Sequence, residues 1–424
     1  MKIKSLDAWE ILDSRGRPTV TVEVSLEGGV IAQAQVPSGA STGKHEALEL
    51  RDGDPQRYGG KGTLRAAANV RDLIAPAVRG MDAGDQAAVD RRMIELGKNL
   101  VGANAILGVS CAVARAAALA RRVPLWRHLA AGRLARLPVP MVNIFSGGLH
   151  AGGNVEFQDF LALPNGITTY SEALHAIVAI HAAAREVTER RGYRLTGVAD
   201  EGGWGPPLPS NQAALELLTE AIERAGYKPA EQVSIAIDVA ASHFHREGRY
   251  ELKSEGRVLA SSEMIDLLER WCARFPVVSI EDGLFEDDWT GWRELTAQLG
   301  AKVQLIGDDF FTTNPARVRR GIVERAANAV LVKMNQIGTL TETFEVVDMA
   351  RAAGWRAVIS ARSGETEDSF LADLATATGA GQIKVGSITR SERLAKYNRL
   401  LELEARAGLE YGWSGTSPMR TLPH

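Results

Sequence analysis

The sequence predicts an α/β protein in which a barrel of alternating strands and helices follows a smaller N-terminal α+β domain. Three observations predict this fold. Six short apolar runs after residue 230 each end at a charged or polar residue. Helical patterns separate these runs at steps of roughly 25 residues, which is typical of βα units. The first 36 residues instead alternate between polar and apolar side chains, as antiparallel strands do, and helical segments follow them.

The N-terminal domain is expected over residues 1–130. Residues 2–36 alternate cleanly and are interrupted by Gly28-Gly29, which predicts antiparallel strands. Residues 87–96 and 103–121 place apolar side chains at helical spacing. The stretch 127–137, which ends before Pro138, is expected to be a linker, so that the barrel domain occupies residues 138–424.

The barrel elements are expected in alternation along this second domain. Strands are predicted at 235–238, 277–281, 303–308, 329–333, 357–360 and 382–384, and a short strand is predicted to end at Asp200-Glu201. Helices are predicted at 168–191, 262–273, 290–299, 315–324, 339–352, 366–378 and 391–407. Residues 244–259 interrupt the rhythm and are predicted to form an inserted hairpin.

The bulk composition excludes several classes of protein. The chain has 424 residues with a net charge of −3, so no basic field favours nucleic acid. No apolar run reaches the length of about 18 residues that indicates a membrane span. The two cysteines, Cys111 and Cys272, lie far apart in helical surroundings and are expected to be reduced core residues. These features favour a cytoplasmic protein that binds neither nucleic acid nor membrane.

Charged side chains end five of the predicted barrel strands. The carboxyl ends of parallel strands meet at one mouth of a barrel, so carboxylates and lysines should converge there. The carboxylates are Asp238, Glu281 and Asp308, and the lysines are Lys333 and Lys384. Oxygen-only ligands favour Mg²⁺, and a lysine beside a metal and other cations should have its ammonium form disfavoured and could act as a base. The alternative is a set of ordinary salt bridges, with Asp308 and Lys333 as a buried ion pair.

Three loops carry weaker signals. Residues 37–46 are rich in Gly, Ser and Thr, and such a loop either approaches a phosphate or metal or is only a mobile connector. His150 and the pair Gln158-Asp159 follow a Gly-rich segment, and a lone loop histidine is more often exposed than catalytic. Asp200-Glu201 precede two glycines, so Glu201 is either a general acid or part of a turn.

Ten motifs give the chain a close resemblance to the enolase (phosphopyruvate hydratase) family over nearly its whole length. They are E-I-L-D-S-R-G at 10–16, P-S-G-A-S-T-G at 37–43, E-L-R-D-G-D at 49–54, D-E-G-G at 200–203, S-I-E-D-G-L at 279–284, G-D-D at 307–309, K-M-N-Q-I-G-T-L-T-E at 333–342, R-S-G-E-T-E-D at 362–368, G-Q-I-K at 381–384 and R-S-E-R-L-A-K-Y-N at 390–398. The resemblance implies an enolase-type modified (βα)8 barrel with an N-terminal α+β capping domain. It also implies a carbon-oxygen lyase (a hydro-lyase) that converts 2-phosphoglycerate to phosphoenolpyruvate.

The resemblance also implies a role for each matching residue. Lys333 would remove the proton α to the carboxylate, and Glu201 would protonate the leaving hydroxyl. Two Mg²⁺ ions are implied, the second arriving with the small anionic substrate. The remaining implied ligands are Asp238, Glu281 and Asp308 for the first ion, Ser41 for the second, Arg362 and Ser363 for the phosphate, Lys384 for the carboxylate, and His150, Gln158 and Asp159 along the substrate. A homodimer or higher homo-oligomer is implied as well.

The chain departs from the family pattern around the substrate. Ala361 stands where the family has a histidine, and Asp159 stands where it has a glutamate. The segments F-S-G-G at 145–148 and W-G-P-P at 204–207 also differ. The chain is therefore identified as a divergent member, and two further hypotheses stay open. It could act on another phospho- or phosphono-carboxylate, as the carboxyphosphonoenolpyruvate synthases of phosphonate biosynthesis do, or it could be a non-catalytic binder.

Overall fold

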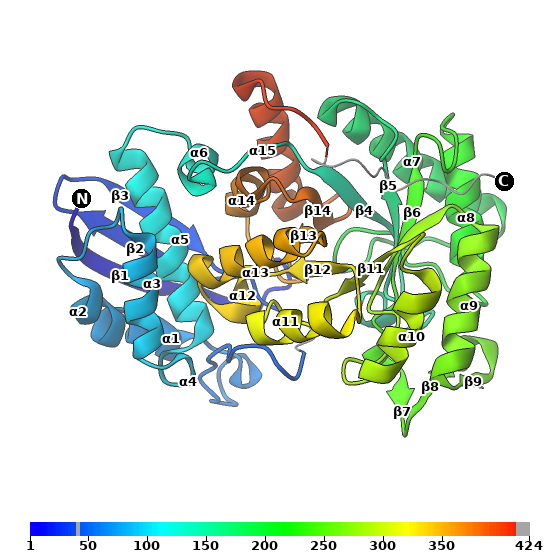
Figure 1. The fold of residues 1–424 in the computed structure, drawn as a ribbon, viewed down its shortest axis with the longest axis horizontal. Coiled ribbons are helices and arrows are strands. Elements are labelled where there is room, and N and C mark those ends of the chain that lie inside the picture. Colours follow the sequence, from blue (N-terminus) through cyan, green and yellow to red (C-terminus); the bar gives the residue numbers. More distant parts are fainter. Residues whose placement is uncertain (40–42, 413–424) are drawn as a thin grey trace.

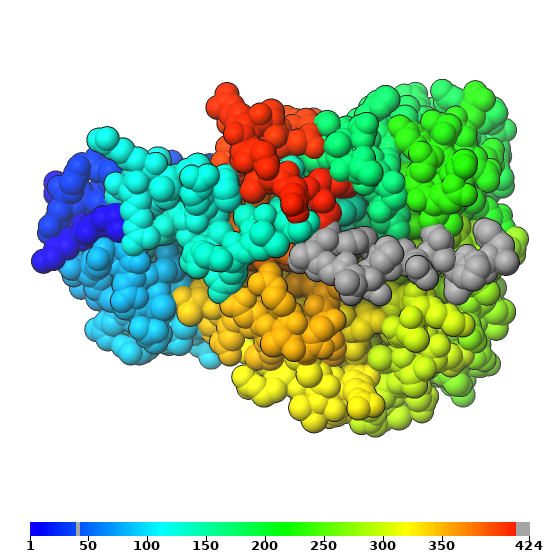
Figure 2. Space-filling model, turned by 45° about the horizontal axis from the view of Figure 1, so that its top comes forward, coloured from blue at the N-terminus to red at the C-terminus, as the bar shows by residue number. Residues whose placement is uncertain are grey.

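The protein is elongated, with a small N-terminal part at one end and a barrel at the other (Figure 1). The structure, a computed structural model, describes residues 1–39 and 43–412. Figure 2 shows the N-terminal segments, in blue and cyan, packed against the yellow and orange segments of the barrel. The active-site residues expected from the sequence belong mainly to the barrel, so the N-terminal part covers rather than builds the catalytic face.

The N-terminal part is a three-stranded antiparallel sheet covered by helices. The strands are β1 (Ile3–Leu12), β2 (Pro18–Leu26) and β3 (Ile31–Gln35), in that order in the sheet. The helices are α1 (Leu64–Asn69), α2 (Ala75–Val78), α3 (Gln86–Glu95), α4 (Lys98–Val101), α5 (Ala103–Ala120) and α6 (Leu125–Ala130), with a π-helical turn, η2 (Val70–Ile74), between α1 and α2. Because α6 reaches Ala130, the prediction of a linker from residue 127 is wrong in its first part.

Helix α5 lies against β2 and β3 and forms the centre of this part (Figure 1). Alanine and glycine on its contact face allow close approach: a Cβ added to Gly108 would lie 2.4 Å from the Val22 side chain. Among the described residues, α5 is the one helix long and apolar enough in composition to cross a membrane, and 83% of it is buried inside the protein. It also buries Cys111, which like Cys272 carries a free thiol.

Eight strands close the barrel, in the order β10-β11-β12-β13-β14-β4-β5-β6. They are β4 (Val139–Ser146), β5 (Asp159–Leu163), β6 (Ser234–Asp238), β10 (Val277–Glu281), β11 (Gln304–Gly307), β12 (Ala329–Val332), β13 (Arg356–Ser360) and β14 (Gly381–Gly386). The six strands that were predicted to be parallel are parallel to one another, whereas β5, which was not among them, runs antiparallel to both neighbours. The connection between β4 and β5 contains no crossover helix, and a parallel pair needs one.

The barrel helices follow the predicted rhythm with a few differences. They are α7 (Tyr170–Arg190), α8 (Asn211–Arg224), α9 (Ser261–Arg274), α10 (Trp289–Leu299), α11 (Pro315–Glu324), α12 (Met334–Ile337), α13 (Leu340–Ala352), α14 (Phe370–Thr378) and α15 (Ser391–Ala407). The sequence did not indicate α8. The predicted strand before Glu201 is wrong, because only Val198 forms a bridge there, to Trp204. The expected hairpin gains a third strand: β7 (His245–Arg246), β8 (Arg249–Leu252) and β9 (Arg257–Leu259).

Two glutamines face each other inside the barrel, between β11 and β14. Gln304 Nε2 donates to Gln382 Oε1 at 3.0 Å, and Gln382 Nε2 donates back to Gln304 Oε1 at 2.8 Å. Gln304 Nε2 also donates to Ser279 Oγ at 3.0 Å. Both glutamine side chains are buried among apolar neighbours such as Val139. Each amide therefore depends on the other for hydrogen bonds that water cannot replace.

Replacing Gln382 by leucine is expected to lower the free energy of unfolding by about 1–3 kcal/mol, because it leaves buried amide atoms of Gln304 unpaired. Urea unfolding monitored by circular dichroism measures this change. The double change Gln304→Leu/Gln382→Leu should cost less than the sum of the single changes, because it removes both polar partners. Gln298→Leu, on the exposed side of α10, is the control. A cost for Gln382→Leu no larger than for this control would contradict the expectation.

Candidate active site

One cavity at the carboxyl ends of the barrel strands collects most of the predicted site residues. The space between its walls, including solvent at the open mouth, is about 360 Å³. Seven predicted catalytic or substrate residues and one predicted metal ligand, Asp238, line it; the seven are His150, Gln158, Glu201, Lys333, Arg362, Ser363 and Lys384. Ala361 lines it as well. The convergence follows from the fold, because strands from across the barrel all end at this mouth.

Lys384, on β14, joins two of the predicted metal ligands. Its Nζ donates to Asp238 at the end of β6 and to Glu281 at the end of β10, both at 2.7 Å. Burial alone would raise the pKa of Asp238, but the Lys384 ammonium holds it below its ordinary value. Burial and the neighbouring Asp238 charge raise the pKa of Glu281 well above its ordinary value. Gln158 Nε2 also donates to Asp238, at 3.2 Å.

Lys333 follows β12 and pairs with Asp308, which follows β11. The sequence prediction of a disfavoured ammonium form concerned a lysine beside a metal and other cations; here its direct partner is a carboxylate. Burial lowers the pKa of Lys333, but the Asp308 carboxylate outweighs it and raises this pKa above its ordinary value. The same pairing outweighs burial at Asp308 and lowers its pKa. A cation bound to Asp308 would remove the cause of the Lys333 shift.

The three carboxylates Asp238, Glu281 and Asp308 fit a hard divalent cation chemically. All of their ligand atoms are oxygens, and Mg²⁺ prefers oxygen. Glu281 Oε1 is buried without a hydrogen-bond partner, so one oxygen of the set faces no protein donor. The lysines neutralise these carboxylates in this structure. The three carboxylates do not form one of the groups of described residues whose ligand atoms all lie within 4.8 Å of one another. Those groups are Asp282 with Asp308 and Asp309, and His150 with Asp159 and Glu201.

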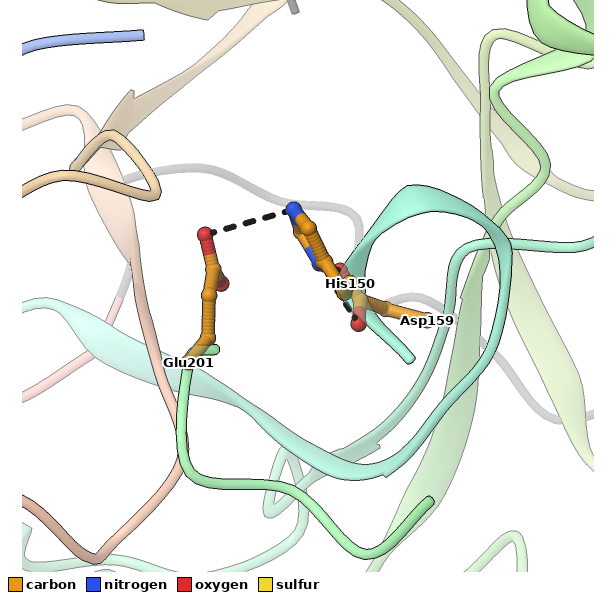
Figure 3. A group of neighbouring side chains, drawn as sticks. All are labelled: His150, Asp159 and Glu201. Atoms are coloured by element: carbon orange, nitrogen blue, oxygen red, sulfur yellow. Dashed lines mark hydrogen bonds and ion pairs between the residues drawn. The ribbon is translucent and has the colours of Figure 1, made fainter. Parts of the chain in front are cut away.

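The side chains of His150, Asp159 and Glu201 lie together, with His150 between the two carboxylates (Figure 3). His150 and Glu201 line the cavity. His150 Nδ1 lies 3.0 Å from Asp159 Oδ2, and His150 Nε2 lies 3.7 Å from Glu201 Oε1. Burial lowers the pKa of His150, but Asp159 and Glu201 outweigh it and raise this pKa to about 9. Burial raises the pKa of Glu201, and His150 with more distant cations brings it below its ordinary value. The expected exposed loop histidine is therefore a buried imidazolium.

This imidazolium should give the protein a pH-dependent stability. The folded pKa of about 9 lies above the ordinary 6.5, so the contribution is complete below about pH 6.5 and is lost as pH rises through 9. Between pH 7 and pH 10 the free energy of unfolding should fall by a few kcal/mol more in the wild type than in His150→Gln. Denaturant unfolding at both pH values measures this difference. Equal falls in the two proteins would contradict the expectation.

Buried partners hold the Arg362-Ser363 segment after β13. Arg393, on α15 and fully buried, donates to the carbonyl oxygens of Arg362 and Ser363, both at 2.6 Å, and to that of Val385 at 2.9 Å. Arg15 Nη1 donates to Ser363 Oγ at 3.1 Å. Neither arginine was predicted to have a role, although each lies in a motif of the family. Ser41, the predicted ligand of a second ion, lies outside the described residues.

Two of the departures from the family pattern contact each other. The Ser146 amide donates to the Trp204 carbonyl at 2.8 Å, and the Trp204 amide donates to the Ile144 carbonyl at 2.8 Å. These bonds tie the segment that carries Glu201 to the end of β4. Ser146 Oγ also lies 3.2 Å from Asp159 Oδ1. Asp159 therefore has hydrogen-bond partners on β4 as well as His150.

Comparisons with known proteins cover both parts of the chain. The enolase N-terminal domain model matches residues 3–129, and the enolase C-terminal TIM barrel domain model matches residues 134–422. The "Enolase 1" of Methylococcus capsulatus is 53% identical over 412 residues, which are 96% of this chain and 98% of that protein. The "Enolase" of Rubrobacter xylanophilus is 55% identical over 411 residues, 96% of this chain and 95% of that protein. These matches confirm the predicted fold class, and the chain belongs to the enolase family of hydro-lyases.

Proposed function

We propose that the chain, in dehydrating 2-phosphoglycerate to phosphoenolpyruvate, uses Lys333 as base and Glu201 as acid. The observation that carries this assignment is the single cavity that both residues line together with Arg362 and Lys384. Relatives that are more than half identical over nearly the full chain bear the name enolase, which supports this reaction. Nothing in the comparisons favours the divergent phosphono-carboxylate alternative or the non-catalytic binder.

The proposed reaction moves one proton to the base and one from the acid. Lys333 removes the proton from C2, next to the carboxylate, and the electron pair forms the C2–C3 double bond. The hydroxyl on C3 leaves as water with a proton from Glu201. Because the pKa of Glu201 lies below its ordinary value, Glu201 must take up a proton before it can act as the acid, and His150, whose Nε2 lies 3.7 Å from Glu201 Oε1, is a neighbour that can supply it. Burial of the whole cavity strengthens each charge interaction because water is largely excluded.

The substrate would be held through its two anionic ends. Arg362 and Ser363 are assigned to the phosphate and Lys384 to the carboxylate, while His150, Gln158 and Asp159 line the reacting carbons. Asp238, Glu281 and Asp308 are assigned to a first Mg²⁺, and Ser41 to a second that arrives with substrate. When bound, these ions supply charge stabilisation for the doubly charged carboxylate that forms when the C2 proton leaves.

The assembly and setting of the enzyme are also proposed. We assign residues 1–130 to a capping domain and 138–424 to the catalytic domain. We propose a homodimer or higher homo-oligomer, and the apolar side chains that β1 and β3 leave exposed support it: Trp9, Leu12 and Ile31. Sedimentation of the full chain tests this proposal. The small phosphorylated substrate and the buried, unpaired cysteines support a cytoplasmic enzyme with no nucleic acid or membrane partner.

Purified protein with 2-phosphoglycerate and Mg²⁺ should produce the ultraviolet absorbance of phosphoenolpyruvate. Removing Mg²⁺ with EDTA is expected to lower the rate by at least about 10²-fold, because the developing charge would lose its main stabilisation. Adding excess Mg²⁺ should restore the rate. Persistence of the full rate in EDTA would contradict the metal assignment. Absence of product under any Mg²⁺ concentration would contradict the reaction.

A further inference from the structure

Glu46 contacts the arginine that is assigned to the substrate phosphate. Arg362 Nη1 donates to Glu46 Oε2 at 2.9 Å, and Arg362 Nη2 donates to Glu46 Oε1 at 3.2 Å. The two side chains are only 4% and 8% exposed. A two-point contact between a guanidinium and a carboxylate fixes the plane of the guanidinium as well as its place. Glu46 belongs to the N-terminal part of the chain, whereas Arg362 follows β13, so this pair joins the cap to the barrel.

The same carboxylate also fixes the backbone of its own loop. The Gly43 amide donates to Glu46 Oε1 at 2.9 Å, and the Glu46 amide donates to the Gly43 carbonyl at 3.1 Å. Gly43 lies close to the barrel, since a Cβ added there would be 3.0 Å from Asp309 Oδ1 and 2.9 Å from the Thr312 side chain. The position of Arg362 and the position of residues 43–46 therefore depend on one carboxylate.

Gln336, on α12, links this carboxylate to the proposed metal and base residues. Its Nε2 lies 3.4 Å from Glu46 Oε1 and donates to Asp308 Oδ1 at 2.9 Å. Its backbone carbonyl accepts from the Ala47 amide at 2.8 Å. Its neighbour Asn335 accepts from Arg362 Nη1 at 3.0 Å. Hydrogen bonds thus run without interruption from Arg362 through Glu46 and Gln336 to Asp308.

We propose that Glu46 is a positioning residue that orients the Arg362 guanidinium for the substrate phosphate and ties it to residues 43–47. The inference rests on the proposed role of Arg362 in phosphate binding. Glu46 touches no reacting atom. The phosphate does not change bonding in the dehydration, so contacts to it act equally on bound substrate and transition state. Losing the orientation of Arg362 should therefore raise KM and leave kcat nearly unchanged.

The test compares KM and kcat for 2-phosphoglycerate in four full-length proteins. Glu46→Gln keeps the shape of the side chain and removes its charge, and KM should rise about tenfold with kcat within about threefold of wild type. Arg362→Lys should raise KM at least as much. In the double variant, KM should match that of Arg362→Lys alone, because Glu46 acts only through Arg362. A multiplied effect in the double variant would overturn the proposal, as would a KM in Glu46→Gln that is unchanged or lower.

Glu342→Gln is the matched control, because Glu342 also pairs a cap residue with the barrel. It accepts from Lys98 Nζ at 2.6 and 2.8 Å and is not in contact with Arg362 in any hydrogen bond of the described residues. Both variants should lower the melting temperature, but Glu342→Gln should keep the wild-type KM. An equal rise of KM in Glu46→Gln and Glu342→Gln would show that Glu46 only stabilises the fold and does not position Arg362. Failure of wild-type turnover, or an unchanged KM in Arg362→Lys, would instead contradict the proposed function.

Discussion

Changing Lys333 to alanine is expected to lower the dehydration rate by about 10²–10⁴-fold or more, the range in which a positioned general base acts. Lys333 Nζ projects into the cavity from the end of β12 and pairs there with Asp308. Alanine leaves the strand intact but removes the group assigned to the C2 proton. Exchange of that proton with deuterated water, followed by NMR on 2-phosphoglycerate, should disappear together with turnover. Survival of the exchange would show that another group is the base.

Two controls separate loss of the base from loss of the fold. Lys228→Ala removes an exposed lysine whose partner is Glu231, and it should leave both rates unchanged. Lys333→Ala also leaves Asp308 without its ammonium partner, which could alter the fold locally. Circular dichroism and the melting temperature of each variant measure that effect. A Lys333→Ala protein with a wild-type spectrum and no exchange would support the assignment.

The barrel strands could be predicted where a charged residue marks the end of an apolar run. The segments at β6, β10 and β12 are apolar runs stopped by charge, and a strand buried on both faces gives that pattern, whereas β14 carries Gln382 and Lys384 inside the strand. The antiparallel β5 could not be predicted this way, because an apolar run does not specify strand direction. Helix α8 was not predicted, although Ser210 caps its N-terminus and apolar side chains recur along it at helical spacing.

The sequence predicts the residues of the candidate site, but of their pairings it anticipated only Asp308 with Lys333. Asp238 and Glu281 end their strands and Lys384 lies within β14, so the barrel brings them together whatever their roles. The Lys384 ammonium lies 2.7 Å from both carboxylates. This contact depends on side-chain geometry, which cannot be read from the spacing of residues in the sequence. The contact between Glu46 and Arg362, which lie 316 residues apart in the sequence, could not be predicted for the same reason. Residue roles came from the resemblance to a family.

Changing Glu201 to glutamine should separate the two proton transfers. Glutamine keeps the size of the side chain but can neither donate nor accept a proton at neutral pH, so dehydration should fall by about 10²–10⁴-fold. Lys333 is untouched, so exchange of the C2 proton should continue near the wild-type rate, measured by the same NMR experiment. The rate of C2 proton exchange divided by the rate of dehydration should therefore rise by the same factor by which the dehydration rate falls.

The outcome of the Glu201→Gln experiment also tests how the two sides of the cavity depend on each other. Glu189→Gln on the exposed side of α7, where the carboxylate pairs with Arg185, is the control and should change neither rate. If exchange instead falls in parallel with dehydration, removal of the proton requires departure of the hydroxyl, and Glu201 and Lys333 act in one step. If dehydration persists, another group donates the proton, and His150, whose Nε2 lies 3.7 Å from the Glu201 carboxylate in the wild type, is the neighbouring candidate. The comparison therefore distinguishes a stepwise elimination with Glu201 as acid from both alternatives, because each predicts a different pair of rates.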